Sequence, residues 1–132
     1  MASELKVDKF TGVTTAGSID VTGEGTATTN LQQGLCKYFG VWDNNSDTTL
    51  RDSFNITSAS DNATGDFTVT FTNTMSNEFY SALGNTSGEN NQYGPCSSQD
   101  THSTTGCGYQ ARKTGTTTDF NKNSFAGLGD LA

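Results

Sequence analysis

Residues 48–74 constrain the fold more than any other stretch, because they alternate in the manner of two paired β-strands. One strand face in each half of the stretch carries the large apolar residues: Leu50, Phe54, Ile56, Phe67, Val69 and Phe71. Successive strand side chains point to opposite faces, so each half also has a hydroxyl-rich face. Asp52 is the one polar residue on the apolar face of the first half and indicates a bend or an edge. Residues 60–66 are rich in turn formers but too many for a two-residue turn, so we expect a hairpin with a looser loop.

The chain carries little apolar material for its length. Of its 132 residues 31% are hydrophobic and only 16% are charged, against about 25% charged in ordinary globular proteins. Thr, Ser, Asn and Gly fill the difference, and a small domain of this kind buries a modest core. We therefore expect one domain that gains stability from oligomerisation. Eight Phe, four Tyr and one Trp, mostly in alternating patterns, argue against disorder for residues 35–83.

Charge and hydropathy exclude several classes of partner. The net charge of −7 and the low isoelectric point argue against nucleic acid, because phosphate binding needs clustered Lys and Arg. No apolar run approaches the ~20 residues of a membrane span, so we expect no membrane insertion. Residues 1–10 are charged and lack the apolar core of a signal peptide, which predicts that the protein is not exported by the classical route.

The chain divides into an extended N-terminal arm (residues 1–33) and a β-domain (residues 34–132). The arm has short alternating pieces punctuated by glycine, and it is read either as an attachment segment or as a floppy terminus. Residues 31–37 allow one turn of helix. Residues 35–42 have apolar side chains on both strand faces, so this strand should be buried on both sides, in a sandwich or at a subunit interface.

The expected fold is all-β, a small antiparallel β-sandwich-like domain that follows the extended arm. A long polar loop is expected at residues 84–108, where the sequence turns irregular. Four further segments have the composition of strands: residues 79–83, 109–113, 116–120 and 124–128.

Cys96, His102 and Cys107 are the residues of the polar loop that most resemble a chemical site. Their spacing lacks the paired cysteines of a structural zinc site, and Cys36 would have to supply a distant fourth ligand. A Cys96–Cys107 disulfide is the sharper alternative, and two free thiols are the commoner one.

Other chemistry has no positive signal. The acidic turns at residues 43–47 and 61–66 lack the glycine and distal glutamate of a calcium loop, so we read them as ordinary turns. His102 has no nucleophile or paired carboxylate near it in the sequence. The sequence therefore predicts no catalytic residue, no metal, no cofactor and no enzyme activity.

Six short sequence motifs carry a resemblance to a known family, and they follow one another along the chain: LKVDKF (5–10), VTTAGSI (13–19), TTNLQQGL (28–35), RDSFNITS (51–58), DNATGDFTVTFTNTM (61–75) and GDLA (129–132). In sequence and in spacing these motifs resemble those of small structural proteins and fibre-tip domains of marine tailed bacteriophages, of the cyanophage and pelagiphage type. That family often has Trp at the position of Phe39, whereas the only Trp here is Trp42. Residues 84–124 match none of the motifs of that family.

The resemblance implies a homotrimeric virion component, assembled in the host cytoplasm and exposed on the particle. Residues 1–33 would contact other virion proteins, and the β-domain of a tail fibre or spike would face outward toward a host glycan or protein. Candidates for receptor contact are Tyr93, His102, Tyr109 and Arg112, and the alternative is that these are ordinary solvated loop residues. The alternative function is a capsid or tail decoration protein without a receptor. A depolymerising tailspike enzyme would need a longer chain.

Overall fold

The computed structural model describes residues 6–12, 19–22, 26, 28–45, 49–87, 93–98 and 101–132, with the side chains of 32, 33 and 93–98 outside the description. The contacts of the chain divide it into two compact units, Met1–Leu35 and Cys36–Ala132. The boundary lies two residues from the one expected after residue 33.

The described part of the first unit contains a small hairpin and one helical turn. Strand β1 (Asp20–Thr22) pairs antiparallel with β2 (Thr28–Asn30), and α1 (Leu31–Gly34) follows. The amide of Leu31 donates a hydrogen bond of 2.8 Å to the carbonyl of Ile19, which ties the start of α1 to the hairpin. The single helical turn that residues 31–37 allow thus occupies Leu31–Gly34. Residues 6–12 form no strand, and the rest of the predicted arm lies outside the described residues.

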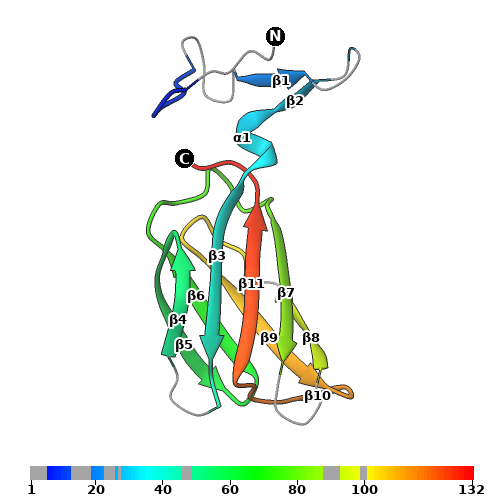
Figure 1. The fold of residues 1–132 in the computed structure, drawn as a ribbon. Helices are drawn as coiled ribbons and strands as arrows, with labels where there is room; N and C mark the ends of the chain where they lie inside the picture. Colours follow the sequence, from blue (N-terminus) through cyan, green and yellow to red (C-terminus); the bar gives the residue numbers. More distant parts are fainter. Residues whose placement is uncertain are drawn as a thin grey trace. The chain divides into compact units, whose positions relative to one another are not determined.

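The second unit is all-β and antiparallel (Figure 1). Its strands run in the order β4-β3-β11-β7-β8-β9-β6-β5, and β10 pairs with β9. Their bounds are β3 (Cys36–Asp43), β4 (Thr49–Phe54), β5 (Ile56–Ala63), β6 (Asp66–Phe71), β7 (Ser81–Ser87), β8 (Tyr93–Ser98), β9 (Gly106–Lys113), β10 (Thr116–Thr117) and β11 (Lys122–Leu128).

The strands lie in two layers, with β4, β3, β11 and β7 in one and β5, β6 and β9 in the other (Figure 1). Strand β8 joins the layers because its first half pairs with β7 and its second half pairs with β9. The resulting arrangement is sandwich-like, as the alternation of the sequence predicted.

The predicted hairpin exists only in part, because its first arm is split at Asn55. Strand β4 pairs with β3 in one layer, whereas β5 pairs with β6 in the other. Asn55 has a φ of 57°, a conformation that Asn tolerates better than most residues. Its side chain holds the corner by accepting a bond of 2.7 Å from the amide of Asn73 and donating one of 3.0 Å to the carbonyl of Lys37. The edge indicated by Asp52 is real, since β4 ends the strand order.

The turn of the hairpin is tighter than expected. Strand β5 continues to Ala63, which pairs with Asp66, so only Thr64 and Gly65 connect the two strands. Gly65 has a φ of 70°, which glycine adopts without steric cost. The predicted loose loop at residues 60–66 is therefore wrong, because its polar residues belong to strands that expose one face to water.

The predicted long loop at residues 84–108 is also wrong in its extent. Residues 84–87 belong to β7, residues 93–98 form β8, and residues 106–108 begin β9. The prediction from local composition failed here because this polar segment is extended through its pairing with both layers and not through the β-propensity of its residues.

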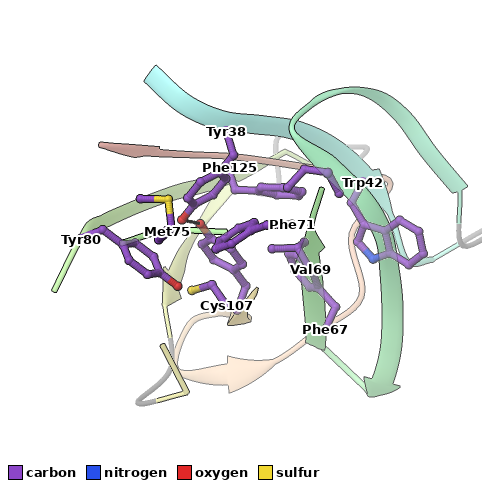
Figure 2. Close-up of a cluster of buried hydrophobic side chains, with 11 residues drawn as sticks. Tyr38, Trp42, Phe67, Val69, Phe71, Met75, Tyr80, Cys107 and Phe125 are labelled. Atoms are coloured by element: carbon purple, nitrogen blue, oxygen red, sulfur yellow. Dashed lines mark hydrogen bonds between the residues drawn. The ribbon is translucent and has the colours of Figure 1, made fainter. Parts of the chain in front are cut away.

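The core lies between the two layers and is mostly aromatic (Figure 2). The ring of Phe67 stacks on that of Tyr109 at 5.5 Å, and Tyr109 lies 5.1 Å from Phe125 of the opposite layer. The hydroxyls of Tyr38 and Tyr109 share a buried hydrogen bond of 2.9 Å that joins β3 to β9. Because these rings are large, few side chains suffice to fill the core of a chain with little apolar material.

Candidate functional site

The outer surface of the β4-β3-β11-β7 layer carries an apolar row that crosses all four strands. On β3, Tyr38 and Trp42 point into the core, so Phe39 between them points outward. The strand register places Phe54 of β4 and Ala126 of β11 on either side of Phe39, and Leu83 of β7 next to Ala126. We call Phe54, Phe39, Ala126 and Leu83 the outer row.

The large residues of the outer row are exposed to solvent in the single chain. The exposed fractions are 51% for Phe54, 39% for Phe39 and 55% for Leu83. Leu128, the next outward residue on β11, is 40% exposed. Isolated exposed apolar side chains are common, but a contiguous group on one sheet face marks an interaction surface.

The outer row has an aromatic end and a hollow end. At the aromatic end the rings of Phe39 and Phe54 are stacked, with centroids 6.0 Å apart and an interplanar angle of 24°. At the other end β11 presents the small side chains of Ser124 and Ala126. A shallow hollow of about 280 Å³ lies there, lined by Leu83, Gly84, Asn85, Ser124, Phe125 and Ala126.

The outer surface of the other layer is chemically different. Between the buried side chains of β6, Thr68 and Thr70 point outward, and their partners on β5 are Ser60 and Ser58. Asn62 donates a hydrogen bond of 2.8 Å to the hydroxyl of Thr68 on this surface. The hydroxyl-rich face expected from the sequence is thus on this layer, and the two outer surfaces differ sharply in polarity.

A second candidate is the group of polar core residues around Cys107. Its thiol is buried beside Tyr38, Tyr80 and Tyr109, and burial raises its pKa to about 11. Burial likewise raises the pKa values of the Tyr38 and Tyr80 hydroxyls above their usual range. A thiol that stays protonated at neutral pH is a poor nucleophile, so the arrangement suits packing rather than covalent chemistry.

A third candidate is a polar cluster at the end of β3, built on the buried side chain of Asn44. Its Oδ1 accepts hydrogen bonds of 3.0 Å from the Phe120 amide and 2.9 Å from Nδ2 of Asn123. Its Nδ2 donates to Oδ1 of Asp119 at 3.2 Å, and that same oxygen accepts a bond from the amide of Gly65. The cluster ties together three segments distant in sequence, so its role in the described structure is to fix this end of the fold.

Asp43, in the first of the acidic turns, already has partners for both carboxylate oxygens. Oδ2 accepts a hydrogen bond of 2.7 Å from Arg51, and Oδ1 accepts one of 3.0 Å from the amide of Asn45. Within the described ranges no group of three or more His, Cys, Asp or Glu side chains could hold a metal ion.

The three predicted receptor residues whose side chains are described lie in different surroundings. Tyr109 is fully buried in the core, so its proposed contact with a receptor is wrong. His102 is partly exposed and packs edge-on against Tyr80 at 4.9 Å. Arg112 is exposed near the far end of β9, where it donates to Gln110 and to the carbonyl of Gly115. Tyr93 lies on β8, and its side chain is outside the described residues.

The predicted Cys96–Cys107 disulfide does not fit the strand register. Cys96 of β8 lies opposite Ala111, four residues along β9 from Cys107, and Cys107 is a free thiol. Four strand residues span about 13 Å, whereas a disulfide needs Cα atoms within about 7 Å. The alternative of free thiols fits Cys36, which is exposed, and Cys107, which is buried.

Sequence reasoning missed Leu83 and Ala126 as members of a surface. The signal that could have found the outer row was the strand at residues 35–42, with apolar side chains on both faces. That strand was expected to be buried on both sides, in a sandwich or at a subunit interface, yet Phe39 on its second face is 39% exposed in the single chain. Burial of that face at a subunit interface stays a prediction.

Comparisons with protein-family models, with curated proteins and with solved structures found no match. None of the described helices is long and apolar enough to cross a membrane.

Proposed function

We propose that the protein is a structural component of a bacteriophage virion, a homotrimer that belongs to a tail fibre or spike. One observation carries the assembly part of the proposal: the outer row is apolar, contiguous over four strands and exposed in the single chain. A chain that leaves such a surface open gains stability when another molecule covers it.

The phage assignment is supported by the six sequence motifs that resemble those of virion proteins of marine tailed phages. The rigid antiparallel framework and its hydroxyl-rich face suit a protein displayed on a particle, since such a surface stays hydrated when the other face is covered. In the proposed role residues 1–33 attach the chain to the particle, and the β-domain faces outward toward a host surface glycan or protein.

The proposal is tested on phage particles produced with the intact gene and with the gene disrupted. Mass spectrometry and cryo-microscopy should find the chain in the intact particles, in copies that are multiples of three. Recovery of the chain only from the soluble lysate would overturn the virion role.

Adsorption of the two kinds of particle to host cells separates the two virion functions. Particles that lack a fibre or spike component should adsorb much more slowly than intact ones. If both adsorb equally well, the protein is a decoration protein of the capsid or tail and meets no receptor.

A further inference from the structure

The two ends of the outer row differ in what they offer to another molecule. The Phe39–Phe54 ring pair lies on β3 and β4, whereas the hollow lies over Ser124 and Ala126 of β11. The walls of the hollow include Leu83 of β7, so its chemistry matches that of an aromatic ring. Both features lie on one face, two strand spacings apart in the register.

Charge indicates which molecule could occupy this face. The chain has a net charge of −7, so two copies repel each other wherever their acidic surfaces approach. The outer row contains no charged side chain, and the next row on one side (Asp52, Val41, Ser124 and Asn85) contains Asp52 alone, at the β4 edge. On the other side the next residue of this face on β3 is Lys37, which is buried. The outer row is therefore a surface through which two acidic copies can meet without opposing like charges.

The size of the apolar group also fits contact between copies. From their exposed fractions, Phe39, Phe54, Leu83 and Leu128 together offer roughly 400 Å² to solvent, taking about 200 Å² for each whole side chain. A standard interface buries about 800 Å² on each partner, with an apolar centre and a polar rim. The outer row together with Leu128 is large enough to be that centre.

We propose that the outer row is the contact between copies of this chain, in which the Phe39–Phe54 pair of one copy fills the Ser124–Ala126 hollow of the next. This inference rests on the proposed homo-oligomeric virion role and names its interface. A contact between two different patches repeats from copy to copy and closes into a ring when the rotation allows. Closure after three copies is what the trimer requires.

Cysteine cross-linking tests the contact, with Cys36 and Cys96 replaced by serine and buried Cys107 retained. The test variant is Phe54→Cys with Ala126→Cys. Within one chain these positions are separated by β3, so their Cα atoms lie about 9.6 Å apart, too far for an internal disulfide. Mild oxidation of dilute protein should give chains linked covalently through positions 54 and 126, identified by mass spectrometry of the joined peptides.

The matched control is Phe54→Cys with Ser60→Cys, because Ser60 lies on the hydroxyl-rich face. Cross-linking of the test variant that does not exceed that of the control, in a protein that is oligomeric, would overturn the inference and leave the virion role standing. A wild-type protein that is monomeric at every concentration would overturn both the interface and the proposed trimer.

A charge placed on the aromatic end gives a second measurement without oxidation. Phe54→Glu should weaken association about 100-fold, as expected for a central aromatic contact. Thr70→Glu adds the same charge to the hydroxyl-rich face and should leave the association constant nearly unchanged. Equal effects of the two substitutions would show that net charge, and not the outer row, controls assembly.

Discussion

Gly127→Ala should be among the most destabilising single-methyl changes in the protein. Gly127 of β11 lies directly opposite Tyr38 of β3, and the Tyr38 ring packs over it. A Cβ atom at position 127 would lie 1.9 Å from Cε1 and 2.4 Å from Cζ of that ring. The ring is fully buried and its hydroxyl is bonded to Tyr109, so it cannot move aside freely.

The expected cost follows from the two consequences of displacing the ring. Overpacking of a core costs about 1–3 kcal/mol, and a buried hydroxyl that loses its partner costs a similar amount. The lower entropy of the unfolded alanine chain returns about 0.4–1 kcal/mol. We therefore expect a loss of about 3 kcal/mol in the free energy of unfolding, and at about 4–8 °C per kcal/mol a fall in Tm of roughly 12–24 °C.

Thermal and urea unfolding, followed by circular dichroism at one protein concentration, measure this loss. Gly115→Ala is the matched control: nothing lies within 4 Å of its Cβ position, so only its φ of 88° is strained, at about 1–2 kcal/mol. In a Tyr38→Leu background the Gly127→Ala change should cost less, because the ring is gone. A Gly127→Ala protein within about 0.5 kcal/mol of wild type, or the same cost in both backgrounds, would refute the packing described for Tyr38.

Three further predictions concern the polar cluster and the thiols. Asn44→Ala should lower the free energy of unfolding by about 3 kcal/mol, measured in urea, because the Phe120 amide and the Asn123 side chain lose a buried acceptor; a change below 1 kcal/mol would contradict this. In native protein a thiol reagent should modify Cys36 quickly and Cys107 only after unfolding, and equal rates would contradict the burial of Cys107. Since burial raises the pKa of Cys107 from 9.0 to about 11, its contribution to stability should be complete below pH 9 and be lost as the pH rises toward 11. A Tm that stays flat over that interval, compared with a Cys107→Ala variant, would contradict this assignment.

The all-β class and several strands could be predicted because they depend on local alternation. Strands β3 and β6 carry large apolar side chains at every second position or nearly so, and β11 carries Phe125 and Leu128. Each of these strands was expected close to its observed bounds. The corner at Asn55 could not be predicted, since alternation continues across it and only the tertiary structure sends β4 and β5 to different layers. Strand β8 was missed because its Gly and Pro residues have low β-propensity.

The candidate site was less accessible to sequence reasoning than the fold. Receptor residues were sought in the segment richest in Tyr, His and Arg, yet Tyr109 fills the core there. The outer row is assembled from four strands, and only the register shows that Ala126 lies between Leu83 and Phe39. The apolar second face of residues 35–42 was the one local sign of a surface that needs a partner.

The solution mass of the purified chain, measured by light scattering over a range of concentrations, tests the central claim most directly. The proposed trimer predicts a mass of about three times the 13.9 kDa of the chain. The Phe54→Glu variant should shift this mass toward that of the single chain at the same concentration. A folded wild-type protein that stays at 13.9 kDa at every concentration would contradict the claim that the outer row assembles copies of the chain.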